Sequence, residues 1–435
     1  MLARAIRDGD DMSGRGSIWS AVTGSEPAER KALALSFLFF FFVLTSYYLL
    51  RPLRDQFSAA VGSTNLWPFW TATLGATLVV TPFFGALVSR YPREKFIPAV
   101  YGFFILCLLA FVPAFRAQQQ LGPYVLGTVF YIWLSVFNLF VVSVFWSFMA
   151  DLFDSAQSRR LFPVIALGGT AGSIAGPLVA RELTIEQLLF AATAALAACI
   201  LCVALLSRRP HGVSEASRRA DAASMIVGGT WWAGLRQIFA QPFLRKMVTL
   251  VMLSEAIGTI AYALVADYVG ANYATPEARK TFNAGIDLAT NTTIILLQAF
   301  VARWVLTRFG LGVGLVLPSI LNVLVLLAVA VVGDAAVVAM LIITRAGAYG
   351  LFKPASDALY TRVDRETRYK GKNVIDTAIW RFGDVVVSGG MRLLHPLAIT
   401  VAGYALICAT CASLAAWFGW RAAHSPDLAP EPRPD

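Results

Sequence analysis

A short stretch of the chain, SYYLLRPLRDQ (Ser46–Gln56), holds residue types that could bind an anion. Arg51, Arg54 and Asp55 follow an apolar run, Ala32–Thr45, that has no charged residue. Their spacing of three and four residues places them on one face of a helix. An ionised side chain at the centre of a bilayer costs about 2.5–3.5 kcal/mol, so it usually faces a water-filled cavity. Two guanidinium groups beside a single carboxylate favour the binding of a carboxylate or phosphate.

Snorkelling is the alternative for these two arginines. At 1.5 Å per residue, Arg51 lies roughly 29 Å beyond Ala32, close to the outer boundary of a bilayer. A long side chain there can place its charge in interfacial water while its stem stays in lipid. The sequence leaves both interpretations open.

Other apolar stretches also carry charges. Arg345, Tyr349, Lys353 and Asp357 are spaced by four residues and form one stripe along a helix. We expect such charges to converge on a shared cavity, with these candidate substrate-binding residues: Arg51, Arg54, Asp55, Glu255, Arg345, Lys353, Asp376, Arg381 and Asp384. Asp376, Arg381 and Asp384 would shape the site or carry a coupling proton. For Arg381 with Asp384, a purely structural ion pair is the alternative.

The composition argues against several other classes of protein. The five cysteines lie within apolar stretches and the three histidines are scattered, so we expect no metal site, no disulfide framework and no cofactor. No apolar stretch holds a nucleophile with a base, which predicts that the chain is not an enzyme. The net charge of +10 lies mostly in short loops and does not indicate a nucleic-acid partner.

The elements that must position the charged residues are membrane helices. The chain is 57% hydrophobic and 14% charged, and runs of about 20 apolar residues recur along it, each long enough to cross a bilayer. The expected fold is therefore an all-α polytopic membrane protein. We predict twelve helical spans: 32–56, 66–88, 96–115, 122–150, 161–181, 187–207, 247–270, 284–306, 310–332, 335–358, 373–393 and 397–420.

Most of the Lys and Arg residues lie in the tails and in loops on one side of the predicted membrane, which predicts that both termini are cytoplasmic. The domain organisation follows from this topology. We predict an N-terminal tail (1–31), a six-helix bundle (32–207), a cytoplasmic linker (208–246), a second six-helix bundle (247–420) and a C-terminal tail (421–435).

The linker contains a predicted amphipathic helix. Trp231, Leu235, Ile238 and Phe239 fall at helical spacing on one face, which is typical of a helix lying at the membrane surface. A soluble linker helix packed on the bundle is the alternative.

The two halves repeat one layout, in which a helix ends at an aspartate and a basic loop leads to the next helix. The examples are FMADLFDSAQSRRLF and PASDALYTRVDRETRYKGK. Such internal duplication is typical of transporters whose solute site lies between two bundles. We expect charged residues near these loops to hold the outward-open state together: Arg90, Arg93, Asp151, Asp154, Arg159 and Arg160.

Three glycines, Gly168, Gly172 and Gly176, lie four residues apart in GGTAGSIAGP. A glycine-rich phosphate loop would need a Lys-Ser or Lys-Thr after it, and none follows. Close helix packing through a face of small residues is the better interpretation.

The loop GALVSRYPREK resembles the signature between helices 2 and 3 of the major facilitator superfamily, with Gly85, Leu87, Arg90 and Arg93 in place and Ser89 where the family has Asp. The segments YYLLRPLRDQ, VFWSFMADLFDSAQSRRLFPVIALGGTAG and ALYTRVDRETRYKGKNVIDTAIWRFGD together resemble its ATP/ADP translocase-like (NTP/NDP exchange transporter) branch. The resemblance implies the major facilitator fold, a monomer and, as one substrate class, nucleotides. The chain departs from the nucleotide antiporters at Asp384, where they have a cation.

We therefore expect a secondary active transporter of the bacterial inner membrane. It would move an anionic small solute by alternating access, with nucleotide exchange of the ATP/ADP type as one version. A proton-coupled carrier or exporter of another anionic metabolite is the first alternative. A non-transporting membrane receptor or assembly factor is the alternative from another class. The expected partners are the solute, the lipid bilayer and, for the proton-coupled version, protons.

Overall fold

The computed structural model describes residues 26, 29–90, 93–207, 231–363 and 371–428, and all regular structure in these ranges is helical. Long apolar runs explain this, because a helix satisfies nearly all of its backbone hydrogen bonds within its own segment. The N-terminal half consists of α3 (Arg30–Val61), η1 (Ser63–Asn65), α4 (Leu66–Arg90), α5 (Arg93–Arg116), α6 (Gln118–Leu121), α7 (Pro123–Leu152), α8 (Ser155–Glu182) and α9 (Ile185–Ser207).

The C-terminal half has the same number of membrane-length helices, several of them divided by single turns of another helical type. Its elements are α11 (Trp231–Ala240), α12 (Pro242–Asn272), α13 (Pro276–Leu296), η2 (Leu297–Ala302), α14 (Arg303–Val332), η3 (Gly333–Ala336), α15 (Val337–Gly347), η4 (Ala348–Phe352), α16 (Lys353–Leu359), η5 (Tyr360–Arg362), α17 (Lys372–Val374), η7 (Ile375–Ile379), α18 (Trp380–Leu394), η8 (His395–Leu397) and α19 (Val401–Ala423).

Twelve membrane-length helical rods can be followed through the described residues, at the places that the sequence predicts. Eight helical stretches are long and apolar enough to cross a membrane, and one of these, Pro276–Arg362, is a continuous run that contains three rods. Gly310, with φ of 81°, separates the first two of them inside α14. The all-α polytopic fold is thus confirmed.

The largest difference from the predicted spans concerns α13, which begins at Pro276 rather than at residue 284. Its start is well defined, because the Thr275 side chain accepts a hydrogen bond from the Ala278 amide at 3.2 Å and Pro276 occupies the first turn. The first turns contain Glu277 and Lys280, which are too polar to be recognised as part of a span. They pack against the other half instead of lipid.

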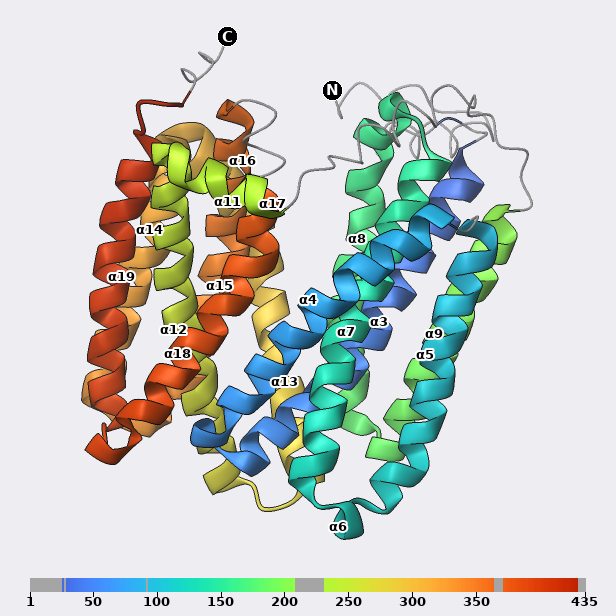
Figure 1. Cartoon of the computed structure of the whole chain (residues 1–435), viewed down its shortest axis with the longest axis horizontal. Coiled ribbons are helices and arrows are strands. Elements are labelled where there is room, and N and C mark those ends of the chain that lie inside the picture. The colour runs from blue at the N-terminus through green and yellow to red at the C-terminus, as the bar shows by residue number, and fades with distance from the viewer. Residues whose placement is uncertain (1–25, 27–28, 91–92, 208–230, 364–370, 429–435) are drawn as a thin grey trace, which may run out of the picture.

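The two halves lie side by side, each a bundle of long helices, and both described chain ends lie at the same end of the molecule (Figure 1). We call this the terminal end and the opposite one the far end. In Figure 1 the halves diverge toward the terminal end and approach each other toward the far end. One apolar cluster crosses between them near the far end, where Phe69 and Trp70 of α4 pack with Ile260 and Val269 of α12.

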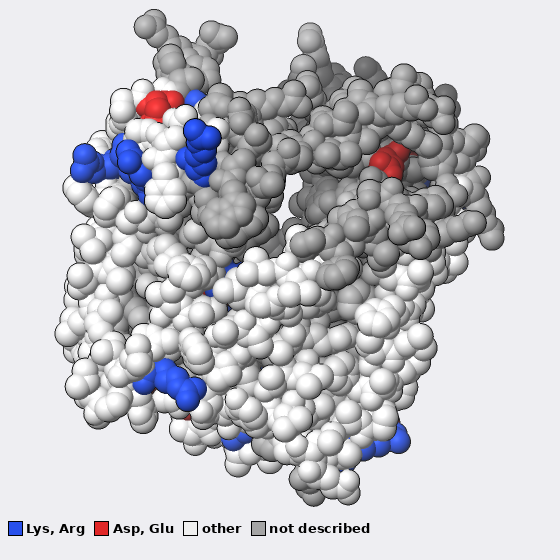
Figure 2. All heavy atoms as spheres, viewed as in Figure 1, with Lys and Arg blue, Asp and Glu red and all other residues white. Residues whose placement is uncertain are grey.

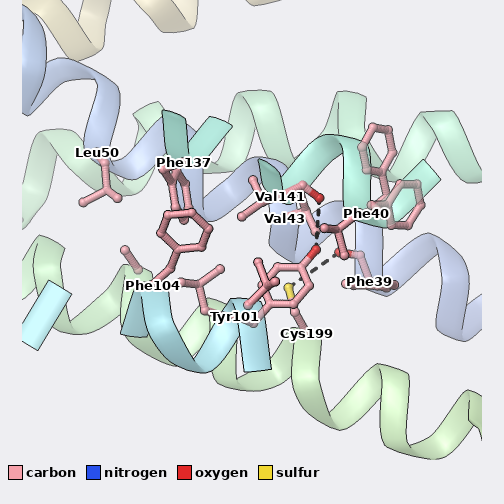
Figure 3. Close-up of a cluster of buried hydrophobic side chains, with 14 of the residues drawn as sticks. Phe39, Phe40, Val43, Leu50, Tyr101, Phe104, Phe137, Val141 and Cys199 are labelled. Atoms are coloured by element: carbon pink, nitrogen blue, oxygen red, sulfur yellow. Dashed lines mark hydrogen bonds between the residues drawn. The ribbon is translucent and has the colours of Figure 1, made fainter. Parts of the chain in front are cut away.

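The core of the N-terminal half lies between α3, α5, α7 and α9, as Figure 3 shows. It is rich in aromatic rings. Phe39 of α3 packs edge-on against Tyr101 at 5.8 Å and Phe145 at 4.9 Å between ring centroids. The Tyr101 hydroxyl donates a hydrogen bond to the Val141 carbonyl at 3.0 Å, which satisfies its polar atom in an apolar setting.

The glycine stripe of α8 packs directly against α3, which confirms the helix-packing interpretation. A Cβ atom on Gly176 would lie 2.6 Å from the Cβ of Tyr48, and Cβ atoms on Gly168 and Gly172 would collide with the carbonyl oxygens of Phe37 and Phe41. Glycine therefore lets the two backbones touch. This close packing holds the helix that carries Arg51 and Arg54 against its own bundle.

The visible surface has few charged groups between its two ends. Figure 2 shows the described Lys and Arg near the ends of the molecule, with a broad uncharged band between them and a trace of blue recessed between the halves. Such a band suits contact with lipid. The linker helix α11 packs on the C-terminal bundle through the buried Ile238, whereas Phe239 is 73% exposed.

Candidate functional site

The charged face of α3 turns toward the other half of the molecule. Arg54 donates two hydrogen bonds to Oδ1 of Asp55, from Nε at 2.9 Å and from Nη2 at 2.7 Å. Arg51 Nε lies 3.8 Å from the other oxygen of Asp55. The three side chains are only 8–14% exposed. Both guanidinium groups also lie over tyrosine rings, Arg51 over Tyr48 at 5.6 Å and Arg54 over Tyr131 at 4.9 Å. Neither arginine extends toward water at the far end.

Two residues of the C-terminal half meet this face. Nη1 of Arg51 lies 3.4 Å from Oδ1 of Asp287, a residue of α13 whose side chain is 2% exposed. The Tyr262 hydroxyl of α12 lies 2.8 Å from Asp55 Oδ1, to which it donates, and 2.9 Å from Ser58 Oγ. Ion-pair and hydrogen-bond contacts therefore join α3 to both α12 and α13 across the interface.

Asp287 was missed by the sequence reasoning. It lies in NAGIDLATNTT, which has polar residues on both sides of the aspartate. A single carboxylate is harder to recognise as unusual there than within a purely apolar run. The available signal was an aspartate within a predicted span.

Arg345 of α15 is the third guanidinium of this cluster. It lies over the Tyr262 ring at 5.4 Å, and no described carboxylate comes within ion-pair distance of it. It is nevertheless near enough to interact electrostatically with Asp55, Asp287 and Glu255. Three guanidinium groups, from Arg51, Arg54 and Arg345, thus surround two carboxylates. We call these five side chains the central cluster.

A second group of side chains lies beside the central cluster, between α12 and α18. Glu255 of α12 and Asp384 of α18 are near enough to interact electrostatically, and Thr259 donates to Asp384 Oδ1 at 2.9 Å. Arg381 Nη1 lies 3.7 Å from Asp384 Oδ2. Gly383 makes room for this arrangement, since a Cβ atom there would lie 3.0 Å from Glu255 Cβ. Glu255, Arg381 and Asp384 therefore lie together beside the central cluster.

Two other predicted residues, Lys353 and Asp376, lie apart from the central cluster and nearer the terminal end. Lys353 Nζ contacts Asp376 Oδ1 at 3.0 Å and Asp357 Oδ1 at 3.3 Å. Lys372 Nζ contacts the same two residues, at 2.9 Å and 3.2 Å. Two cations and two carboxylates therefore neutralise one another. No net charge is left in this quartet for a solute.

The expected gating residues are only partly within the described structure. The side chains of Arg90, Arg93 and Arg159 lie outside it. Arg160 Nη2 contacts Glu29 Oε1 at 3.1 Å, and the Asp154 carboxylate accepts the Gln157 amide at 2.8 Å at the start of α8. Asp151 lies in the last turn of α7. These contacts of Arg160 and Asp154 lie within the N-terminal half.

The two halves are joined by polar contacts at the far end. Lys280, 2% exposed, donates to the Leu183 carbonyl just beyond α8, and the Glu277 carboxylate accepts the Ile185 amide at 3.0 Å. Asp267 accepts the Ser63 amide at 2.7 Å. Closer to the middle, Asn291 donates to the Ser173 carbonyl at 2.7 Å.

The remaining hollows and thiols of the described chain add no competing chemistry. A pocket of about 610 Å³ lies near the far end, between α8, α13 and α15. Its walls are mostly apolar, including Phe282, Ile286 and Val338, and its one cation, Arg181, is accompanied by the carboxylate of Glu277. The five cysteines are free, and the described residues form no group of side chains suited to a metal ion.

Comparison with known proteins bears on the fold. No family model matches this chain, and no curated protein matches its sequence. Among solved structures, a mutant of the nucleoside transporter NupG matches with TM-score 0.65 and 13% identity, over 89% of this chain and 99% of that one. The D-xylose-proton symporter matches with TM-score 0.63 and 12% identity, over 92% and 98%.

A third match is a bacterial homologue of the iron transporter ferroportin in its inward-facing state, with TM-score 0.62 and 14% identity, over 92% of this chain and 100% of that one. Identities this low report a shared fold and leave the solute undetermined. The chain therefore has the fold of these transporters, the major facilitator fold of two six-helix bundles.

Proposed function

We propose that this chain is a secondary active transporter that moves an anionic small solute across the bacterial inner membrane by alternating access. The observation that carries the proposal is the central cluster, in which three partly buried guanidinium groups from both halves surround only two carboxylates. Buried charge of this kind is costly to insert in a membrane and is usually retained for function. The named structural neighbours, all of them transporters rather than enzymes, support the proposal.

The charge balance of the central cluster limits the solute class. Arg51 and Arg54 are each paired with a carboxylate, whereas Arg345 has no carboxylate at ion-pair distance among the described residues. The cluster therefore has one positive charge in excess. A solute with a single carboxylate group would balance this charge and could form paired hydrogen bonds with a guanidinium.

The transport cycle would require the far-end contacts to break. With both termini in the cytoplasm, the contacts of Lys280, Glu277 and Asp267 close the described conformation toward the periplasm, and the helices of the two halves diverge toward the cytoplasm (Figure 1). The opposite conformation would separate α8 from α13 and bring the terminal-end loops together. Arg90, Arg93, Asp151, Asp154, Arg159 and Arg160 would then hold the halves together there, as expected for the outward-open state.

Nucleotide exchange is the finer version that the sequence resemblance implies. Its substrates would bring several negative charges, whereas the central cluster offers one excess cation and the neighbouring Glu255 and Asp384 add carboxyl groups. Lys353 and Lys372 would help only if the solute displaced Asp357 and Asp376. These features favour the alternative, a proton-linked carrier of a smaller anionic metabolite, in which Glu255, Arg381 and Asp384 shape the site.

Uptake into proteoliposomes of the purified protein tests these versions. Labelled ATP is offered to vesicles that are empty or loaded with ADP, with and without a pH gradient, and labelled mono- and dicarboxylates and sugar phosphates are offered in the same way. Uptake of ATP that needs internal ADP and ignores the gradient would establish nucleotide exchange. Uptake of a smaller anion that follows the gradient would establish the proton-linked version.

A non-transporting receptor or assembly factor is the remaining candidate class. Such a protein would bind without moving its ligand, so it would show an anion-dependent thermal shift but no uptake under any gradient. Absence of both anion binding and uptake, in protein shown to be folded, would refute the proposed function.

A further inference from the structure

Asp287 lies in an environment that suits a carboxyl group able to change its proton occupancy. It is 2% exposed, and its Oδ2 atom accepts no hydrogen bond from any described residue. Its Oδ1 atom lies 3.4 Å from Arg51 Nη1, which is longer than a charge-assisted hydrogen bond. Leaving a carboxylate oxygen buried and unpartnered costs free energy, and a proton on Oδ2 removes most of that cost.

The groups that face Asp287 come from the elements packed against α13. Helix α3 contributes Arg51, with Arg54, Asp55 and Tyr48 at longer range, and α15 contributes Arg345. Helix α8 contributes the uncharged Ser173 carbonyl, which accepts a hydrogen bond from Asn291, one turn from Asp287.

Arg51 has its own unsatisfied atom in the same place. Its Nε donates no hydrogen bond to a described residue, although it lies 3.8 Å from Asp55. Asp287 and Arg51 therefore form a long ion pair between the two halves, in which each side chain keeps one polar atom without a hydrogen bond to a described residue. A solute carboxylate or phosphate could satisfy Arg51 better than Asp287 does, because it can approach to hydrogen-bond distance with two oxygens.

We propose that Asp287 is the proton-binding residue that couples anion binding to a proton. The proton would be taken from water onto Oδ2, and the neutral carboxyl group would release Arg51 to an incoming anion. Loss of the proton would restore the Asp287–Arg51 ion pair and expel the anion. One proton and one singly charged anion would then enter or leave together, and the net charge of the central cluster would stay constant.

The same step affects the interface between the halves. The Arg51–Asp287 ion pair joins α3 to α13, so its replacement by an Arg51–anion contact removes one of the attractions that hold the far end closed. Because binding and protonation are linked reciprocally, raising the anion concentration also raises proton occupancy. This inference rests on the proposed anion site, but proton binding at Asp287 can be measured without any solute.

The first experiment measures the proton directly. Infrared difference spectra of the purified full-length protein are recorded over a pH titration for the wild type, for Asp287→Asn and for a matched control, Asp334→Asn, which alters an exposed aspartate in η3. We expect the titrating band of a protonated carboxyl group to disappear in Asp287→Asn and to persist in Asp334→Asn. A spectrum of Asp287→Asn identical to that of the wild type would overturn the proposal.

The second experiment measures the linkage with sulfate as the probe, because the charge of sulfate does not change over the pH range used. Thermal shift or tryptophan fluorescence reports its dissociation constant. In the wild type we expect weaker binding as pH rises, by up to about tenfold per pH unit for one linked proton. In Asp287→Asn, whose side chain is permanently neutral, binding should stay at the low-pH strength throughout.

The two experiments separate the failure of this inference from that of the proposed function. Equal pH dependence of sulfate binding in both proteins would overturn the linkage while leaving the anion site in place. Absence of sulfate binding in both would overturn the linkage and count against the anion site itself, whereas the infrared titration would still decide whether Asp287 holds a proton.

Discussion

At the scale of single residues, Arg345 differs from the other two arginines of the central cluster. Arg51 and Arg54 are paired with carboxylates. Arg345 lies over the Tyr262 ring, and none of the described carboxylates is within ion-pair distance of it. An anion would therefore meet Arg345 without displacing a protein group. This makes Arg345 the residue whose change should affect binding most and folding least.

We predict that Arg345→Ala weakens binding of the transported anion, or of sulfate as a probe, by about 10- to 100-fold, the value of a charged hydrogen bond of roughly 1.5–3 kcal/mol. The melting temperature should change little, since no ion pair is lost. Arg308→Ala, at an exposed arginine of α14, is the control and should bind normally. Unchanged affinity in Arg345→Ala would remove this residue from the site.

Arg54 should behave in the opposite way. Its two hydrogen bonds to the buried Asp55 mean that Arg54→Gln leaves a carboxylate with less compensation. Breaking such a pair costs about 3–5 kcal/mol. We expect a clearly lower melting temperature in detergent for Arg54→Gln, and partial recovery in the double variant Arg54→Gln with Asp55→Asn. A single variant as stable as the wild type would show that this pair has little effect on stability.

At the scale of elements, the contact between α3 and α8 positions the arginines. Gly168, Gly172 and Gly176 form a stripe on which the α3 backbone lies, and the face of α3 with Arg51 and Asp55 meets α12 and α13 of the other half. Without these glycines the two helices would have to move apart. The orientation of the anion-binding face therefore depends on residues that have no charge.

We predict that Gly172→Ala lowers stability by about 1–3 kcal/mol, the usual cost of overpacking, because its methyl group would collide with the Phe41 carbonyl oxygen. The control is Gly102→Ala in α5, where a Cβ atom would meet nothing within 4 Å. Thermal unfolding followed by fluorescence size-exclusion chromatography compares the two. Equal melting temperatures would mean that α3 and α8 can separate at little cost.

At the scale of the whole molecule, the distribution of contacts determines which end is closed. Polar contacts between the described parts of the two halves lie at the far end, as for Lys280 and Glu277, or near the middle, as for Asn291. Lys280 is the most buried of the far-end charges, and its ammonium group meets carbonyl oxygen at the end of α8, where the helix dipole is negative.

We predict that Lys280→Ala shifts the population toward the state that is open at the far end, because only the closed state loses a contact. Spin labels on Leu121→Cys in α6 and Asn272→Cys in α12, in a background without the five native cysteines, report the distance between the halves. A new, longer distance should appear. Arg116→Ala is the matched control, since it breaks the Arg116–Glu186 ion pair within one half. Identical distance distributions for wild type and Lys280→Ala would contradict the prediction.

Several properties of this protein follow from its sequence alone. The lengths of the apolar runs predict the twelve membrane-length helices, because a chain in lipid must satisfy its backbone hydrogen bonds within each helix. The spacing of Arg51, Arg54 and Asp55 predicts that they share a face, and the glycine stripe predicts close packing in α8. These are local properties, for which the helical repeat and the insertion cost of a charge are sufficient.

The partners of the charged residues depended on the tertiary structure. Asp287 meets Arg51, and Tyr262 meets Asp55, only because α12 and α13 pack against α3 from the other half. Spacing along one helix cannot indicate which carboxylate neutralises which guanidinium across an interface. Tertiary packing also separated Lys353 and Asp376 from the central cluster and, within the described part of the chain, brought no carboxylate to ion-pair distance of Arg345. The net charge of the cluster, and hence the solute it suits, is a property of the folded arrangement.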